Sequence, residues 1–181
     1  MVIIAGVDEV GRGSLAGPVT AAAVILKNPI SELKDSKEIS PHKREILSEI
    51  IKEQSIYSFA SISNDKIDKI NIHQATLLAM QEAIMNLPIT PDLVYVDGKF
   101  TPNVEVNCKA VIGGDKLISE ISAASIIAKV HRDDFMKKLD KKYPIYDFAK
   151  NKGYGTAHHL AALRKSGYTS FHRQSFKGVI V

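Results

Sequence analysis

Four acidic residues stand where their type and surroundings could support chemistry. Asp8 and Glu9 end a first apolar run, and Asp97 closes a second one. Asp115 follows a pair of glycines just before a long apolar helix. Any one of them alone is compatible with a solvated turn, and adjacent acids in a regular strand point to opposite faces. If they converge, their charges repel unless cations neutralise them, and oxygen ligands favour Mg²⁺ or Mn²⁺.

A glycine turn follows the first acid pair. The backbone amides of Gly11-Arg12-Gly13 could approach a phosphate or a sugar closely, because glycine has no Cβ, and the guanidinium of Arg12 offers several donors. The alternative is a tight turn with Arg12 at the surface. The spacing fits neither a phosphate-binding P-loop nor a dinucleotide fingerprint. We therefore expect no small-molecule cofactor.

Two further segments combine residues suited to nucleic-acid contacts. In Lys34-Asp35-Ser36-Lys37, the hydroxyl of Ser36 and the charge of Lys37 suit a phosphate, although such tetrads are common on surfaces. Tyr154 stands between two glycines ahead of a predicted helix, where an accessible ring can stack on a base or sugar. A purely structural tyrosine is the other interpretation.

A polar stripe runs along the longest predicted helix, over residues 119–142. Ser122, Ser125, Lys129 and Arg132 are spaced three, four and three residues apart, on one face of an otherwise apolar helix. Polar side chains on a buried helix need partners. These are either structural acceptors or a functional site and its substrate. His158, His159 and His172 are candidate general acids, but we expect each to have a capping or buried role.

The elements that must position these residues follow from hydrophobic periodicity. Strands are predicted at 2–7, 20–26, 56–62 and 93–96, the first two antiparallel, and helices at 42–52, 71–87, 119–142 and 156–166. Strands alternating with helices predict an α/β sheet with helices packed against it. Acids at strand ends lie where open α/β sheets usually bind ligands.

Composition narrows the class of protein. A chain of 181 residues that is 45% hydrophobic, with no linker-like segment, predicts one domain over residues 1–181. Its single cysteine, Cys108, which we expect to serve packing, suits a reducing compartment and thus the cytoplasm. The apolar N-terminus meets acids too soon for a signal peptide or a membrane span. We therefore expect no membrane association.

Basic residues are concentrated toward the C-terminus. The net charge is +4 and the isoelectric point about 9.0, which alone says little about partners. The side expected to meet phosphates carries Lys137, Lys138, Lys141, Lys142, Lys150, Lys152, Arg164, Lys165, Arg173 and Lys177. For 137–142, a solvated helical face is an equal alternative.

Together these motifs resemble bacterial ribonuclease HII. The segments that carry the resemblance come in the family's order and extend over nearly the whole chain: Ala5-Gly6-Val7-Asp8-Glu9-Val10-Gly11-Arg12-Gly13, Asp35-Ser36-Lys37, Val96-Asp97-Gly98, Ile121 to Val130 and Lys152-Gly153-Tyr154-Gly155-Thr156. The resemblance implies an RNase H-like fold with a mixed central sheet flanked by helices and a small C-terminal helical segment.

The resemblance also implies a function. Asp8, Glu9, Asp97 and Asp115 match the family's catalytic, metal-binding carboxylates, which would hold two Mg²⁺ or Mn²⁺ ions. The substrates would be RNA–DNA hybrids and duplex DNA with embedded ribonucleotides, cut on the 5′ side of the ribonucleotide to leave 3′-hydroxyl and 5′-phosphate ends. Such an enzyme would serve DNA repair and primer removal in replication, and we expect a monomer.

Substrate contacts are implied as well. The Gly11-Arg12-Gly13 turn would read the 2′-hydroxyl and Tyr154 would stack on the neighbouring deoxyribose. Both assignments agree with the principle that the 2′-hydroxyl is what separates RNA from DNA. Further contacts are expected from Ser36, Lys37, Ser122, Ser125 and Lys129.

Three positions depart from the family pattern. Ser14 replaces a common proline, Glu38 replaces a second lysine, and Gln174 interrupts a basic pair. The last two changes predict weaker substrate binding. Two alternatives remain: another RNase H-like nuclease, such as a junction resolvase, which would not need the glycine turn or Tyr154, and a non-catalytic nucleic-acid-binding module.

Overall fold

The computed structural model describes residues 2–33 and 39–180. Ser36 and Lys37, which were predicted to contact substrate, lie outside the described residues.

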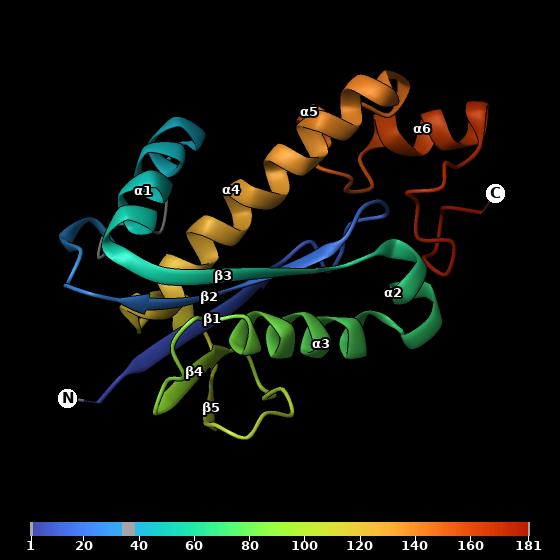
Figure 1. Ribbon diagram of the computed structural model, residues 1–181. Helices are drawn as coiled ribbons and strands as arrows, with labels where there is room; N and C mark the ends of the chain where they lie inside the picture. The colour runs from blue at the N-terminus through green and yellow to red at the C-terminus, as the bar shows by residue number, and fades with distance from the viewer. Residues whose placement is uncertain (1, 34–38, 181) are drawn as a thin grey trace.

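A mixed five-stranded sheet forms the centre of the fold (Figure 1). Its strands are β1 (Ile4–Val10), β2 (Val19–Leu26), β3 (Ser55–Ile62), β4 (Leu93–Asp97) and β5 (Asn107–Val111), in the order β3-β2-β1-β4-β5. β1 pairs antiparallel with β2 and parallel with β4, which in turn is parallel to β5. The predicted antiparallel start and the mixed sheet are both confirmed.

Helices cover both faces of this sheet. In Figure 1, α1 and α4 lie on one face and α3 on the other, while the short helices α5 and α6 lie at the far end of α4. The helices are α1 (Pro41–Gln54), α2 (Asn64–Ile70), α3 (Ile72–Met85), α4 (Ser119–Lys142), α5 (Phe148–Asn151) and α6 (Ala157–Ser166), with 3₁₀ turns η2 (Gly114–Lys116) and η3 (Pro144–Tyr146). None of the helices within the described ranges is long and apolar enough to cross a membrane.

Alternation along β2 explains why both faces are covered. Ala21 and Ala23 belong to the core shared with α3, whereas Ala22 and Val24 belong to the core shared with α1 and α4. Successive strand residues point to opposite faces, so a strand that is buried along almost its whole length must be packed from both sides. The face toward α4 is the one that matters for the site.

α4 lies directly on β1 at Gly6. A Cβ at Gly6 would lie 2.1 Å from the carbonyl carbon of Glu120 and 2.2 Å from the amide nitrogen of Ile121, both backbone atoms of α4. Only a residue without a side chain permits this approach. The contact fixes the first turns of α4 against the strand that carries Asp8 and Glu9.

The C-terminal region packs onto the far half of α4. A third core joins Leu15 and Ala16 to Met136, Phe148 and Leu163. Ala16 also forms an isolated antiparallel bridge with His172. The loop that follows β1 is therefore held by residues from the end of the chain.

Several predicted elements need correction. β1 does not end at the acid pair but continues to Val10, so Asp8 and Glu9 lie inside the strand, because β2 still pairs with β1 after β4 has ended. Helix α2 and strand β5 were not predicted. The helix at 119–142 is confirmed, and the predicted helix start at 71 is confirmed by Asn71, whose side chain accepts a hydrogen bond from the amide of Gln74 at 3.0 Å.

Candidate active site

Strand register places Asp8 beside Asp97. In the parallel pair of β1 and β4, Val7 is the partner of Val96. Asp8 and Asp97, the residues that follow, are therefore level with each other. Paired residues of neighbouring strands point to the same face of the sheet. Asp8 is the antiparallel partner of Ala22, which faces α4. The two carboxyl groups thus meet beneath α4, where β4 ends.

Burial leaves the Asp8 carboxylate in need of positive charge. Asp8 is only 6% exposed. Its pKa is raised well above the usual value, mainly by desolvation and further by the nearby charges of Glu9 and Asp97. Hydrogen bonds from Ser125 and from the amide of Glu9 oppose the rise without cancelling it. A cation at this place would relieve both the burial cost and the repulsion.

Glu9 has one carboxylate oxygen without a partner. Oε2 is buried and makes no hydrogen bond, while Oε1 accepts a long contact of 3.4 Å from Nη1 of the half-exposed Arg12. A buried carboxylate oxygen without a donor is costly, and a cation is the partner that would satisfy it.

The turn after β5 brings Asp115 toward the strand ends. The amide of Gly114 donates a 2.7 Å hydrogen bond to Oδ1 of Asp97. A Cβ at Gly114 would lie 2.5 Å from the side chain of Ile121, so glycine lets the turn pass close to α4. The bond ties η2, and with it Asp115, to the end of β4.

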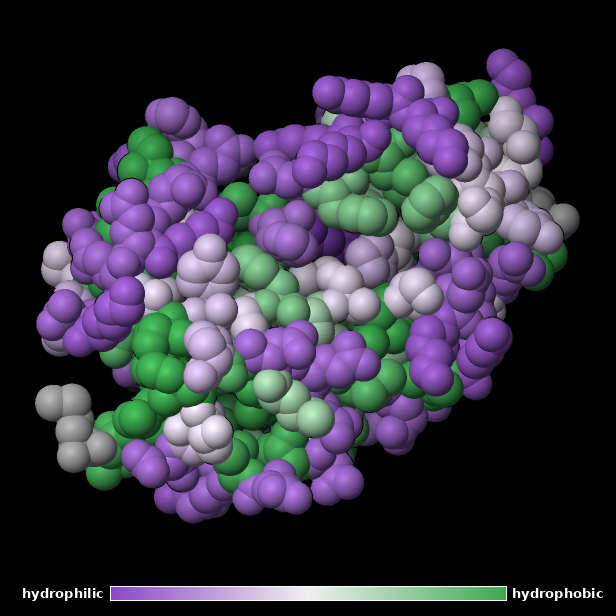
Figure 2. Space-filling model, viewed as in Figure 1, coloured by the Kyte–Doolittle hydropathy of each residue, from purple (hydrophilic) through white to green (hydrophobic). Residues whose placement is uncertain are grey.

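A pocket of about 250 Å³ opens beside these carboxylates, between β1, η2, α1 and α4. Glu9 and Asp115 line it together with Ser122, Ser125 and Lys129 of the predicted polar stripe. These residues were predicted from separate parts of the sequence, and the structure brings them together. Figure 2 shows another face of the molecule, on which hydrophilic side chains gather over α1 and along the outer side of α4.

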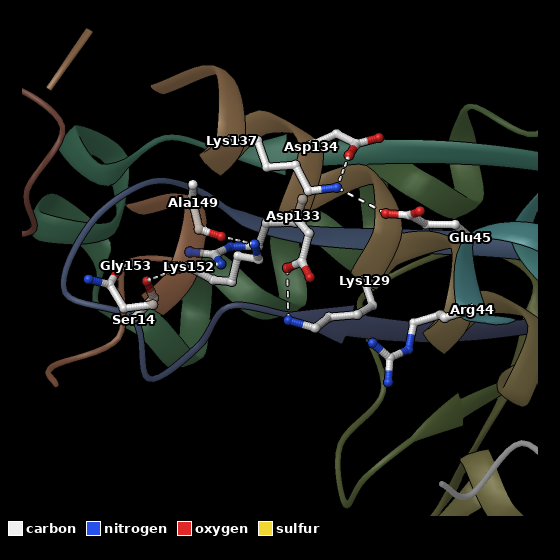
Figure 3. A network of polar contacts seen from close by, with 12 residues as sticks. Ser14, Arg44, Glu45, Lys129, Asp133, Asp134, Lys137, Ala149, Lys152 and Gly153 are labelled. Atoms are coloured by element: carbon white, nitrogen blue, oxygen red, sulfur yellow. Dashed lines mark hydrogen bonds and ion pairs between the residues drawn. The ribbon is translucent and has the colours of Figure 1, made fainter. Parts of the chain in front are cut away.

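Arg44 of α1 is a pocket residue that the sequence did not reveal. It lines the carboxylate pocket and also a neighbouring pocket that contains Lys137, Lys150 and Lys152. In Figure 3, Arg44 and Lys129 point toward the same side of their helices, and Lys129 is paired with Asp133 at 2.8 Å. Nothing in the pattern of α1 distinguishes Arg44 from its charged neighbours, since only the packing of α1 against α4 brings it here.

The carboxylates suit a divalent cation by their chemistry, but no group of three or more His, Cys, Asp or Glu side chains in the described residues already surrounds a common point. Two of the carboxylates are held by protein amides, Asp8 by that of Glu9 at 2.7 Å and Asp97 by that of Gly114. A cation would have to compete with these donors. The buried oxygen of Glu9 and the uncompensated charge at Asp8 are the features that fit one.

The second group of predicted residues lies next to the first. The amide of Leu15 donates to the carbonyl of Gly153 at 2.8 Å, which joins the glycine turn to the loop that carries Tyr154. Tyr154 is 38% exposed, and a Cβ on Gly13 would lie 3.7 Å from Cε1 of its ring. Gly11-Arg12-Gly13 and Tyr154 therefore form one surface beside the carboxylates.

Some candidates have structural roles instead. Arg132 of the polar stripe has a structural role, because it is fully buried and donates hydrogen bonds only to backbone carbonyls. Arg173 is also fully buried, so its assignment to the phosphate-facing surface was wrong. His159 and His172 are buried against each other, as expected, with 3.0 Å between their Nε2 atoms. Cys108 packs against the core, also as expected.

The arrangement of sheet and helices is that of an RNase H-like fold. The crystal structure of ribonuclease H2 from Pyrococcus horikoshii superposes with a TM-score of 0.84 at 25% identity, covering 98% of this chain and 95% of that one. A mixed sheet with carboxylates at the centre, between α4 and the ends of the strands, defines the class as nucleases of this fold.

Sequence comparison gives the family. The ribonuclease HII family model matches residues 5–179, and the chain belongs to that family. Ribonuclease HII of Borreliella burgdorferi is 55% identical over 179 residues, which is 97% of this chain and 99% of that protein. Ribonuclease HII of Caldicellulosiruptor bescii is 51% identical over 96% of this chain and 85% of its own length. The chain is thus a ribonuclease H, as predicted, and membership supports endoribonuclease activity on RNA–DNA hybrids.

Proposed function

We propose that this enzyme cuts on the 5′ side of ribonucleotides, both in RNA–DNA hybrids and singly embedded in duplex DNA, by metal-dependent hydrolysis at Asp8, Glu9, Asp97 and Asp115. The observation that carries the proposal is the placement of Asp8 and Asp97 at the same level beneath α4, next to the unpartnered oxygen of Glu9. These three groups form a partly buried excess of negative charge that a divalent cation would balance.

Two divalent ions, Mg²⁺ or Mn²⁺, would supply a water nucleophile at neutral pH and stabilise the leaving oxygen. The chain's residues would have four tasks. The carboxylates hold the ions, with Asp115 entering from the η2 turn. Lys129 and Arg44 flank the pocket and neutralise the phosphates of the cut strand. Ser122 and Ser125 donate hydrogen bonds from α4. Gly11-Arg12-Gly13 and Tyr154 contact the sugars at the junction.

Recognition of the ribose would depend on the glycine turn. A 2′-hydroxyl both donates and accepts hydrogen bonds, and a backbone amide without a neighbouring side chain can approach it closely. The ring of Tyr154, exposed beside Gly13, would stack on the following deoxyribose. Neither group is required by a nuclease that cuts regardless of sugar, which is why we favour a ribonucleotide-sensing enzyme.

The test is a cleavage assay on three duplexes of one sequence: an RNA–DNA hybrid, DNA with one ribonucleotide, and all DNA. With Mg²⁺ or Mn²⁺ we expect the first two to be cut, the second at the 5′ side of the ribonucleotide with a 3′-hydroxyl end, and the third to stay intact. Equal cutting of all three would refute sugar sensing. Binding without cleavage in either metal would favour a non-catalytic module. Monomeric state and cytoplasmic location stay predictions from the sequence.

A further inference from the structure

Two fully buried arginines lie beneath the loop 11–18, which contains the glycine turn. Arg173 donates from Nη2 to the carbonyl of Gly11 at 2.6 Å, from Nη1 to that of Arg12 at 2.8 Å and from Nε to that of Gly17 at 3.0 Å.

Arg132 holds the other half of the loop. It donates to the carbonyls of Pro18 at 2.9 Å and Ala16 at 3.1 Å, and to that of Lys152 at 2.9 Å. Each of the two guanidiniums is thus used by three backbone carbonyls, and no carboxylate of the described residues forms an ion pair with either.

These hydrogen bonds also fix the direction in which the N–H groups of the glycine turn point. A trans peptide is planar, so its N–H points opposite to its C=O. The carbonyls of Gly11 and Arg12 point inward to Arg173, and the N–H groups that share their peptide planes belong to Arg12 and Gly13. Both N–H groups therefore point away from the core, and within the described residues neither donates to a protein acceptor.

We infer that Arg173, with Arg132, is a positioning residue for ribose recognition: it fixes the two peptide planes so that the amides of Arg12 and Gly13 face the 2′-hydroxyl. This inference rests on the proposed function of the glycine turn. Arg173 also places a buried positive charge under the turn, but the property that orients the two peptide planes is its fork of hydrogen-bond donors. A lysine keeps the charge and cannot reach three carbonyls in this fixed geometry.

The fork is also a link to the end of the chain. The amide of Arg173 donates to the carbonyl of Leu15 at 2.8 Å, and the carbonyl of Phe171 accepts from the amide of Gly17 at 2.8 Å. The segment 171–173 is thereby laid along the loop as well as beneath it. The pKa of Arg173 is lowered to about 9 by desolvation and by Arg132, which leaves the guanidinium charged at neutral pH.

The test compares Arg173→Lys with Lys27→Arg, an exchange of the same two residue types at an exposed position just after β2, at the end of the sheet remote from the acids. Two quantities are measured well below the melting temperature of each variant: kcat/KM on DNA with one ribonucleotide, and Kd for the all-DNA duplex. We expect Arg173→Lys to lose about 100-fold in kcat/KM, mostly in kcat, as a misplaced contact does, with the Kd for all-DNA within twofold of wild type. Lys27→Arg should match wild type in both.

An unchanged kcat/KM in folded Arg173→Lys would overturn the inference. So would a loss of equal size in affinity for all-DNA, because that would mean general damage to the binding surface. If Arg173→Lys does not fold, Arg132→Lys is measured in the same way. A wild-type enzyme that fails to cut the ribonucleotide-containing duplex would instead refute the proposed function, so the two failures are distinguishable.

Discussion

The residue-scale question is which glycines serve the fold and which serve the substrate. Gly11 has φ +90° and a Cβ there would lie 2.1 Å from Nε of Arg132, so the fold requires it. Gly13 has no positive φ, and its Cβ would make only an ordinary contact with Tyr154 at 3.7 Å. The protein alone therefore gives no reason for glycine at position 13, which leaves close approach of the substrate.

We accordingly predict that Gly13→Ala folds as well as wild type and cleaves poorly. The free energy of unfolding should change by no more than about 1 kcal/mol, because the backbone conformation of Gly13 is one that alanine also adopts. The kcat/KM on a ribonucleotide-containing duplex should fall at least about 10-fold, since the methyl group would occupy the space that we propose for the ribose. Urea unfolding and the cleavage assay check the two parts. Full activity in this variant would remove the argument for sugar contact at Gly13.

At Asp8, the proposed metal site is linked to the stability of the fold. Its raised pKa means that the metal-free protein gains stability from this group at low pH and loses it as the pH rises through that pKa. Asp8→Asn removes the penalty, so the metal-free variant should be at least as stable as wild type at pH 7. It should also lose at least about 100-fold in metal-dependent turnover.

Thermal melts with and without Mn²⁺ check the stability part of this prediction. At a concentration near 100 Kd, Mn²⁺ should raise the melting temperature of the wild type by about 5–10 °C. It should leave Asp8→Asn nearly unchanged. The same metal-induced rise in both proteins would show that the ion binds elsewhere.

At the scale of elements, the site depends on how closely α4 approaches β1. We predict that Gly6→Ala destabilises the protein by about 3 kcal/mol or more, because its methyl group would overlap backbone atoms of α4 that cannot rotate away. Gly13→Ala is the matched control, with the same atom added one loop away. Denaturant midpoints of the two variants provide the measurement, and equal midpoints would contradict the close packing of α4 on β1.

The helices and strands also show which parts of the fold could be predicted from the sequence. α4 was predicted with its observed bounds because its first half is rich in small and apolar residues, most of which are buried. β5 was missed because most of its side chains are exposed at the sheet edge, so it has no apolar alternation. α2 was missed because it has only 7 residues. The four carboxylates could be selected as candidates because each stands next to a glycine or a predicted strand, which is local information.

At the scale of the whole molecule, the missed features are those made by distant contacts. The bond from Arg173 to Gly11 spans 162 positions and that from Arg132 to Ala16 spans 116. A buried arginine looks like any basic residue in the sequence, so Arg173 was assigned to the phosphate-facing surface. Its role becomes visible only when the C-terminal segment is seen lying along the loop after β1.

We predict that the pair formed by His159 and His172 makes the contact between the C-terminal segment and the loop after β1 sensitive to pH. Nδ1 of His159 lies 2.9 Å from the carbonyl of Tyr154, so it must carry a proton. Nε2 of a neutral His159 then accepts from Nε2 of His172, and Nδ1 of His172 accepts from the amide of Thr169 at 2.9 Å. The network is complete only when both rings are neutral.

The pKa of His172 is accordingly lowered to about 4, by desolvation and by His159, and that of His159 is lowered by desolvation. Since the folded state binds fewer protons than the unfolded state, stability is full above the ordinary histidine pKa and falls as the pH drops from about 6.5 to about 4. For His172 the loss is about 3 kcal/mol. We expect it to loosen the C-terminal segment and Tyr154 together.

The prediction is tested in the Asp8→Asn background, because the raised pKa of Asp8 acts in the opposite sense over acidic pH. The free energy of unfolding is measured from pH 7 to pH 4 for this protein and for the same protein with His172→Asn or His158→Gln added. His172→Asn should flatten the fall in stability even if it lowers stability at pH 7. His158→Gln, at an exposed ring, should leave the slope as it was. A slope that survives His172→Asn would mean that other groups cause the acid sensitivity, and the histidine pair would then be no more than packing.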